Sequence, residues 1–154
     1  MLHIVLFNPE IPPNTGNVIR LCANTGFHLH LIKPLGFDMD DKKLRRAGLD
    51  YHEWATVQVH DDWPHFLANT EVARVFACET SGRVRHVDVR FQPNDALVFG
   101  PETRHVPQRL LDSLPPEHTI RLPMRPGQRS LNLSNAVAVV AFEAWRQLDF
   151  AGAV

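Results

Sequence analysis

The chain has 154 residues, a formal net charge of −1, and a composition that is 44% hydrophobic and 21% charged. These values are typical of one soluble globular domain, residues 1–154, that is long enough to bury a hydrophobic core. They exclude a protein that is basic throughout, as many nucleic-acid-binding proteins are, and no apolar run approaches the roughly 20 residues of a membrane span.

Two cysteines, Cys22 and Cys78, lie in apolar stretches, which indicates reduced thiols and a cytoplasmic protein. The nine histidines are scattered along the chain. His28 and His30 share one face of a predicted strand, but no third ligand with metal-site spacing accompanies them. We therefore expect no bound metal.

The N-terminal segment predicts a strand followed by a helix. Leu2–Phe7 is a short apolar run typical of a buried strand. Three prolines between residues 9 and 13 exclude a regular element there, so the helix is expected to begin near Asn14 or Thr15 and to end at Gly26. Arg20 then lies near the first turn of this helix, beside the end of the strand.

The next segment completes a strand–helix–strand unit, because Leu29–Ile32 alternates as a second strand. This order is typical of a parallel α/β fold. Asp40–Ala47 then predicts a helical turn with an acidic start and a basic end. It carries the densest basic cluster of the chain: Lys42, Lys43, Arg45 and Arg46. This cluster is either a solvated helix face or a surface that faces phosphate groups.

The remaining sequence alternates further strands and helices. An amphipathic helix is expected over Asp61–Asn69, with Trp63, Phe66 and Leu67 on its apolar side, and SGRVRHVDVRF predicts a turn and a short alternating segment. The other predicted elements are strands at Ala73–Glu79, Ala96–Phe99 and Thr119–Leu122 and a short helix at Gln108–Leu114.

The last predicted element is a helix within Arg129–Leu148. Its middle, Ala136–Phe142, is apolar at every position, so we expect protein to surround it, either in the core or in a subunit interface. Asn132 or Ser134 can cap its N-terminus, and Arg146 suits the dipole of its last turn.

Three strand-to-loop junctions carry polar sequences with glycine or proline: Asn8–Arg20, Gly100–Pro107 and Arg125–Asn135. In an open parallel sheet, ligands bind beyond the carboxyl ends of the strands, so one shared site is expected there. The sequence contains no Walker loop, no GxGxxG and no GxSxG motif, and a covalent nucleophile is only weakly indicated.

The segments NPEIPPNTGNVIRLCANTG, LVFGPETRHVP and LPMRPGQRSLNLSNAVAVVAFEAWRQ resemble the three signature motifs of the SPOUT class of methyltransferases. The resemblance covers nearly the whole chain and is strongest to the small members that methylate the wobble nucleotide of tRNA. It implies an α/β parallel sheet with helices on both faces, a C-terminal deep trefoil knot, and a homodimer. Periodicity alone gives no hint of a knot, which is rare in proteins.

The resemblance also implies S-adenosyl-L-methionine as methyl donor and the ribose 2′-hydroxyl of nucleotide 34, C or U, as acceptor. The expected substrate is the anticodon stem-loop of tRNA, with leucine isoacceptors as the implied tRNAs. By position in the motifs, catalytic roles fall on Arg20, Ser134 and Asn135, and Asn14 helps to shape that site. Cofactor contacts fall on Cys78, Gly100, Glu102, Leu122, Ser130 and Leu131. RNA contacts are expected from Lys42, Lys43, Arg45, Arg46 and Arg125.

A guanidinium group is too basic to act as a plain general base, so Arg20 is expected to stabilise the developing alkoxide. His105 departs from the family pattern, which reads GPETRGLP, and a left-handed backbone at this position would strain a histidine. Two alternatives stay open: the same reaction at another RNA site, and an RNA-binding module without turnover. An unrelated Rossmann-like nucleotide binder is disfavoured because the first loop is not glycine-rich.

Overall fold

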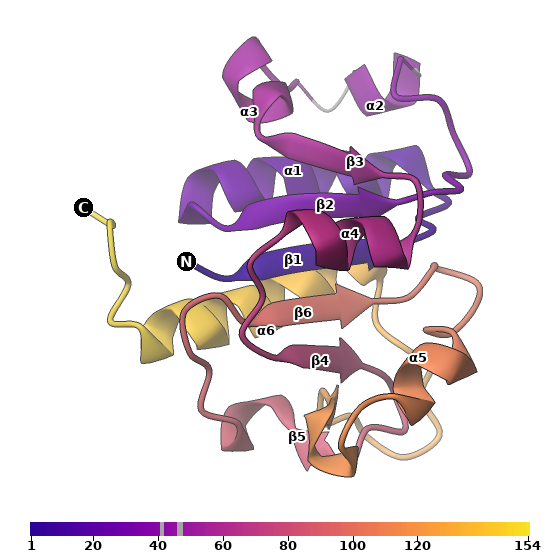
Figure 1. Ribbon diagram of the computed structural model, residues 1–154, viewed down its shortest axis with the longest axis vertical. Helices are drawn as coiled ribbons and strands as arrows, with labels where there is room; N and C mark the ends of the chain where they lie inside the picture. Colours follow the sequence, from indigo (N-terminus) through magenta and orange to yellow (C-terminus); the bar gives the residue numbers. More distant parts are fainter. Residues whose placement is uncertain (41, 46–47) are drawn as a thin grey trace.

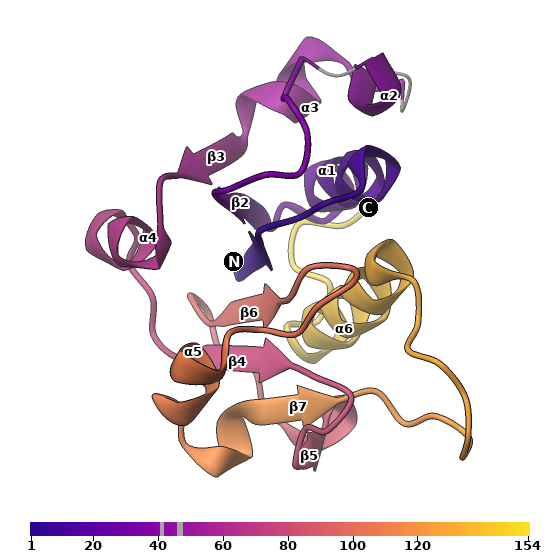
Figure 2. The same ribbon diagram turned by 90° about the vertical axis from the view of Figure 1, so that its right-hand side faces the viewer.

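The computed structural model describes residues 1–40, 42–45 and 48–154. Within these residues, one seven-stranded sheet has the order β3-β2-β1-β6-β4-β7-β5, and every neighbouring pair is parallel (Figure 1 and Figure 2). The strands are β1 (His3–Phe7), β2 (His28–Ile32), β3 (Val57–His60), β4 (Val75–Cys78), β5 (Val84–Arg85), β6 (Ala96–Phe99) and β7 (Thr119–Arg121).

Helices cover both faces of this sheet, which confirms the predicted α/β class. Figure 2 shows α1 and α6 on one face and α4 and α5 on the other. The α-helices are α1 (Pro12–Thr25), α2 (Lys42–Arg45), α3 (Tyr51–Ala55), α4 (Trp63–Asn69), α5 (Gln108–Asp112) and α6 (Leu133–Gln147). Two 3-10 turns, η1 (His86–Asp88) and η2 (Pro116–His118), complete the described elements. Among the residues that the structure describes, no helix has the length and apolar character that crossing a membrane requires.

The central strands are apolar at successive positions because each of their faces is covered by helices. In β1, Ile4 and Leu6 belong to the core beneath α1 and α6, whereas Val5 belongs to the core on the opposite face. In β6, Leu97 and Val98 divide between the two cores in the same way. A continuous apolar run therefore identified both strands.

Helix α1 begins earlier than predicted. Pro12 and Pro13 occupy its first turn, and Ile11 is the N-cap residue, without a capping side chain. Proline suits this place because the first helical N–H groups have no partner inside the helix. Gly26 ends the helix in a left-handed conformation, with φ 78°, as predicted. Because of the early start, Arg20 lies beyond the middle of α1 and not near its first turn.

Several elements near the β3 edge of the sheet were missed or assigned incorrectly. Neither α3 nor β3 was predicted, because β3 is an edge strand in which polar residues alternate. Asp50 caps α3 through a reciprocal capping box with Glu53. In α4, Phe66 is buried but Leu67 is 46% exposed, since successive helical residues point about 100° apart. Arg46 of the predicted basic turn lies outside the described residues.

Strand β7 lies between β4 and β5, although β5 directly follows β4 in the sequence. Ile120 of β7 is paired with Cys78 on one side and Val84 on the other. The connection from β4 to β5 crosses β7 so closely that a Cβ atom on Gly82 would lie 2.3 Å from the carbonyl carbon of Ile120. A strand from late in the sequence is therefore inserted between two strands that follow one another in the chain, and the trefoil knot stays a prediction.

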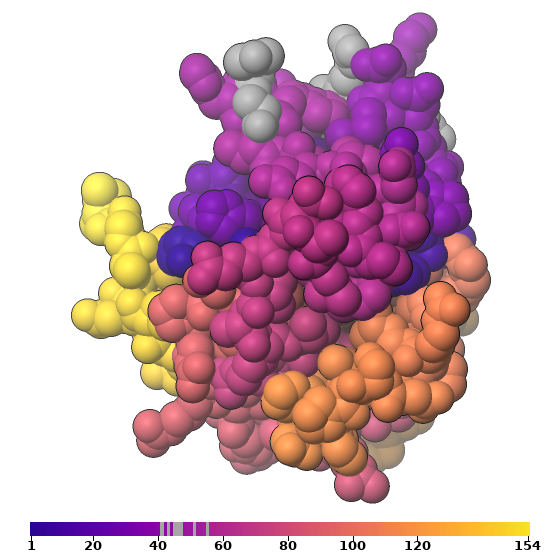
Figure 3. Space-filling view, in the orientation of Figure 1, coloured from indigo at the N-terminus to yellow at the C-terminus, as the bar shows by residue number. Residues whose placement is uncertain are grey.

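Four histidines form a continuous hydrogen-bonded chain across β1, β2, β3 and α4, which the sequence analysis treated as scattered residues. His3 Nδ1 lies 3.0 Å from His30 Nε2, His30 Nδ1 lies 2.9 Å from His60 Nε2, and His60 Nδ1 lies 2.9 Å from His65 Nδ1. The α4 segment lies in front of this part of the sheet in Figure 1 and forms the middle of the surface seen in Figure 3. The described residues contain no group of three or more side chains suited to hold a metal ion.

The direction of these hydrogen bonds follows from one carbonyl group. His3 Nε2 lies 3.1 Å from the carbonyl oxygen of Glu71, which only accepts, so His3 donates there and accepts at Nδ1. His30 and His60 must then each donate through Nε2, and His65 donates through Nδ1. The chain is complete when all four imidazoles are neutral. Burial, and next the neighbouring His3, lower the pKa of His30 to about 3.

This histidine chain predicts that acid weakens the fold. Below pH 6.5 His30 takes up a proton in the unfolded chain, whereas in the folded chain it stays neutral down to about pH 3. The contribution of His30 to the free energy of unfolding is therefore fully present above pH 6.5 and is lost as the pH falls from 6.5 to about 3. The free energy of unfolding should drop by roughly 3 kcal/mol between pH 6.5 and about pH 4, as measured by urea denaturation. His30→Gln should flatten this slope, and His65→Gln, at the exposed end, should retain most of it. An unchanged slope in His30→Gln would contradict the assignment.

Candidate functional site

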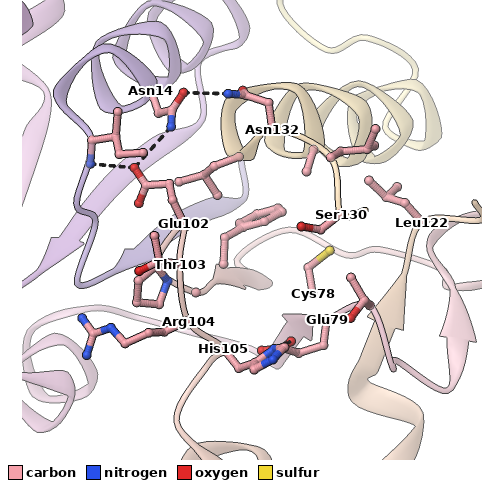
Figure 4. A pocket seen from close by; sticks show the side chains of 18 of the residues that line it. Asn14, Cys78, Glu79, Glu102, Thr103, Arg104, His105, Leu122, Ser130 and Asn132 are labelled. Carbon is pink, nitrogen blue, oxygen red and sulfur yellow. Dashed lines mark hydrogen bonds and ion pairs between the residues drawn. The ribbon is translucent and has the colours of Figure 1, made fainter. Parts of the chain in front are cut away.

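A cavity of about 640 Å³ opens at the carboxyl edge of the sheet (Figure 4). The segments that line it follow β1, β4, β6 and β7, which includes all three junctions singled out in the sequence. Parallel strands place their carboxyl ends at one edge, so loops distant in sequence meet there. The expectation of one shared site at this edge agrees with the geometry.

The six predicted cofactor-contacting residues all line this cavity: Cys78, Gly100, Glu102, Leu122, Ser130 and Leu131. Arg20, Ser134 and Asn135 are not among the lining residues, nor is Arg125, although its neighbours Met124 and Gln128 are. The structure thus gathers the predicted cofactor residues and leaves the predicted catalytic residues outside the cavity of the same chain.

The carboxylate of Glu102 binds the loop that precedes α1. It accepts hydrogen bonds from the backbone N–H groups of Glu10 at 2.9 Å and Ile11 at 2.7 Å, and from the side-chain amide of Asn14 at 3.3 Å. A hydrogen bond to a charged acceptor is stronger than one to a neutral acceptor. Glu102 therefore uses its oxygens to join the loops after β1 and β6, and it shapes the cavity from within the protein.

Glu10 returns this contact in the opposite direction. Its carboxylate accepts from the backbone N–H of Thr103 at 2.9 Å and from the Thr103 hydroxyl at 2.7 Å. These bonds, the hydroxyl contact first, lower the pKa of Glu10 below its ordinary value. The carboxylates of Glu10 and Glu102 each bind the loop that carries the other, and so they hold the two loops together.

Asn14 extends the network to the third loop. Its side-chain oxygen accepts a hydrogen bond from the amide of Asn132 at 2.9 Å, and Asn14 is itself buried. Asn132 also caps α6, because its side-chain oxygen accepts from the backbone N–H of Asn135 at 3.3 Å and from the Ser134 hydroxyl at 2.7 Å. The three predicted junctions are therefore connected by side chains, as Figure 4 shows for Glu102, Asn14 and Asn132.

Gly100 is required by the loop itself. A Cβ atom at this position would lie 2.6 Å from the backbone nitrogen of Val106 and 2.8 Å from the carbonyl carbon of His105. The loop after β6 turns back on its own start, and only glycine leaves room for this return. The close neighbour that requires glycine here is the returning backbone of the same loop.

His105 fits its position without a left-handed backbone, since it is absent from the residues with positive φ. Its Nδ1 lies 3.0 Å from a carboxylate oxygen of Glu79, and the other oxygen of Glu79 accepts the backbone N–H of Val106. The backbone strain that a left-handed conformation would cause at His105 is therefore absent. Glu79 was not predicted as a site residue, although a charged residue directly after a buried strand was a usable signal.

Cys78 lies beside Glu79 in the cavity wall. Burial, followed by the negative charge of Glu79, raises the pKa of the Cys78 thiol to about 12. The thiol is therefore protonated at neutral pH and is a poor nucleophile. The sequence, too, indicates a covalent nucleophile only weakly.

Arg20 is held on the surface of α1, away from the cavity lining. Its Nε donates to a carboxylate oxygen of Glu53 at 3.2 Å, and one terminal nitrogen donates to the carbonyl oxygen of Gly48. Its side chain is 49% exposed. A surface ion pair of this kind contributes little stability, so the guanidinium can exchange these partners for a ligand at small cost.

The network around Glu102 predicts a measurable loss of stability on its removal. Glu102→Ala leaves three donors without their charged acceptor, and the free energy of unfolding should fall by about 1–3 kcal/mol in urea denaturation. Glu117→Ala, which changes an exposed glutamate in η2, is the matched control and should stay close to the wild type. Equal stability of the two variants would contradict the role assigned to Glu102.

Comparison with known proteins identifies relatives over the whole chain. Residues 1–142 match the model of the SpoU rRNA Methylase family. The chain is 60% identical over 154 residues, with 100% of both chains covered, to the tRNA (cytidine(34)-2'-O)-methyltransferase of Methylovorus glucosotrophus (strain SIP3-4). A solved structure concerned with the 2-OH methylation of C/U34 on tRNA is 47% identical, with a TM-score of 0.89 and 97% of each chain covered.

A more distant structure shows the same fold. The SpoU methyltransferase AviRb from Streptomyces viridochromogenes, solved in complex with the cofactor AdoMet, has a TM-score of 0.82 at 23% identity. The similarity covers 97% of this chain and 61% of that one. The match over residues 1–142 and the identity along the full length lead to one assignment. The chain belongs to the SpoU methylase family.

Proposed function

We propose that the protein transfers the methyl group of S-adenosyl-L-methionine to the ribose 2′-hydroxyl of the wobble nucleotide, position 34, of tRNA. The observation that carries this proposal is the 60% identity, over both complete chains, to a tRNA (cytidine(34)-2'-O)-methyltransferase. C or U at position 34 is the acceptor, and leucine isoacceptors are the tRNAs that we expect. The free thiols of Cys22 and Cys78 suit a cytoplasmic enzyme.

The cavity suits the cofactor in size and chemistry. Its volume of about 640 Å³ lies within the range of sites for small molecules, and its wall combines apolar side chains such as Phe99 and Leu122 with polar loops. The loops at Gly100, Leu122, Ser130 and Leu131, together with Cys78, would hold the cofactor, and Glu102 would keep these loops in place. When bound, S-adenosyl-L-methionine supplies a methyl group on a positively charged sulfur.

The protein's task in the reaction is to favour an alkoxide-like 2′-oxygen. This oxygen forms a bond to the methyl carbon while the carbon–sulfur bond breaks, and its proton passes to water or phosphate. Arg20 stabilises the negative charge that develops on the oxygen, as donors of an oxyanion site do. Ser134 and Asn135, in the first turn of α6, would orient the ribose. Holding the hydroxyl in line with the methyl group provides much of the remaining rate.

A homodimer accounts for the absence of Arg20 from the residues that line the cavity of its own chain. Helix α6 was predicted to be surrounded by protein, but Val139 and Phe142 on it are 44% and 45% exposed in the single chain. An apolar helix face of this kind is suited to pack against a second copy. Such packing would let Arg20 of one protomer act on a ribose held over the cavity of the other.

The anticodon stem-loop of tRNA is the expected RNA partner, and basic residues would bind its phosphates. Lys42 and Arg125 are exposed, the latter in the loop between β7 and α6. Lys43 and Arg45 share α2 with Lys42, and Arg46 follows them in sequence. The same reaction at another tRNA or rRNA site is the nearest alternative, and an RNA-binding module without turnover is the second.

The proposal predicts a ribose methyl group at position 34 after incubation of the protein with S-adenosyl-L-methionine and unmodified tRNA. Mass spectrometry of nuclease fragments locates the methyl group. Arg20→Ala should lower the single-turnover rate at saturating tRNA by about 100-fold, the scale of one lost oxyanion donor, with little change in cofactor affinity. Arg20→Lys should not restore the rate, because an ammonium group lacks the planar fork of donors.

Other results of this experiment separate the alternatives. Methylation at a different nucleotide would favour the same reaction at another site, and cofactor-independent tRNA binding without turnover would favour the binding module. A wild-type single-turnover rate in Arg20→Ala would contradict the catalytic role of this residue.

The dimer proposal predicts that Phe142→Asp yields a monomer, because a charge in an apolar interface is costly to desolvate. Sedimentation velocity at micromolar concentration should show a dimer for the wild type and a monomer for the variant. Val87→Asp, which changes another exposed apolar residue, in η1, is the matched control and should remain dimeric. A monomeric wild type would refute the proposal.

A further inference from the structure

Glu79 places a carboxylate in the wall of the cavity at the end of β4. Its side chain is only 8% exposed. It lines this cavity and also an adjoining cavity of about 530 Å³, so it stands between the two. A charge with little access to water acts on a nearby ligand more strongly than an exposed charge, because solvent and salt screen it less.

The two cavity carboxylates differ in how far the protein offsets their charge. Glu102 accepts from three N–H donors. Glu79 has one backbone donor, the N–H of Val106, and one imidazole, that of His105. While His105 is neutral, the pair keeps a full negative charge. The carboxylate of Glu79 is thus the less compensated of the two.

The other charged or titratable groups near this pair leave that charge in place. Cys78 remains a neutral thiol because burial raises its pKa to about 12. Arg104 is an exposed residue of the same loop. At the adjoining cavity lie the exposed residues Arg83 and Asp112, and Asp112 accepts a hydrogen bond from Gln108 and adds no positive charge. Glu10 is held by Thr103, on the side of the loop that faces α1. Exposed cations act through water and are screened, so they offset a buried carboxylate weakly.

We infer that Glu79 is a specificity-determining residue that makes the cavity prefer the cationic methyl donor to its neutral product, and that His105 adjusts this preference with pH. The inference rests on the proposed function, because it assigns the cavity to S-adenosyl-L-methionine. The donor and S-adenosylhomocysteine differ by one methyl group and by the positive charge on sulfur. A weakly compensated carboxylate in the wall attracts the positively charged sulfur of the donor. It has no such attraction for the neutral sulfur of S-adenosylhomocysteine.

His105 is placed to switch this charge. Its side chain is 79% exposed, and its Nδ1 lies 3.0 Å from the carboxylate of Glu79. Imidazoles titrate between about pH 5 and pH 8, and protonation of His105 would put a positive charge next to Glu79. The preference for the cation is therefore weak in acid and strong in mild base. A glycine at position 105, as in the family pattern, would remove the switch and leave the charge.

Isothermal titration calorimetry with S-adenosyl-L-methionine and S-adenosylhomocysteine tests the inference. The measured quantity is the Kd of the product divided by that of the donor, because the amino and carboxyl groups common to both ligands cancel in this ratio. For the wild type, the ratio should rise by about 3- to 10-fold from about pH 5.5 to about pH 8. Glu79→Gln should give the low ratio at both pH values, and His105→Gly the high ratio at both.

Glu117→Gln removes an equal charge from an exposed site in η2 and should behave as the wild type does. A wild-type ratio at both pH values in Glu79→Gln would overturn the role of Glu79. A persisting pH dependence in His105→Gly, whose altered side chain is exposed and leaves the core intact, would overturn the role of His105. Failure of the wild type to bind either ligand would instead overturn the proposed function, and the inference with it.

Discussion

The carboxylate of Glu102 is the contact on which the functional edge of this protein depends. It lies in the loop after β6, yet all its donors belong to the loop after β1 and to the first turn of α1. Asn14 carries the connection on to Asn132 and so to the start of α6. Three segments that are remote in sequence are thereby fixed around one cavity by the protein's own side chains. Such preorganisation reduces the ordering cost of binding.

The same arrangement divides the polar residues of the site by task. Glu102, Glu10 and Asn14 satisfy one another and the backbone, which makes them part of the framework. Glu79 and His105 bind the loop after β6 from the opposite side and retain electrostatic influence over the space within. Arg20 is held on the surface by an ion pair with Glu53 and a hydrogen bond to the carbonyl oxygen of Gly48, partners that it can exchange at small cost. Rigid support and adjustable charge thus reside in different side chains.

The sequence predicted the parts of the fold that depend on local pattern. β1 and β6 were found because both of their faces are buried, and α6 because it is long and free of glycine and proline. The residues lining the cavity came from motif resemblance and from their place after strands. Hydrogen-bond partners that only the tertiary structure brings together could not be predicted. No local sequence pattern connects His3 with His65, or Glu79 with His105. The edge strand β3 was not predicted because half of its residues are polar.

The place of β7 within the sheet sets an order on assembly. Among the described strands, β5 has β7 as its sole neighbour, and β7 also provides the backbone oxygen of Ile120 to the N–H of Glu79. A chain emerging from the ribosome therefore cannot complete the wall that contains Cys78 and Glu79 until β7 has been made and has paired between β4 and β5. Ligand binding by the nascent protein would therefore report that β7 has taken its place in the sheet, because the cavity wall is incomplete without it.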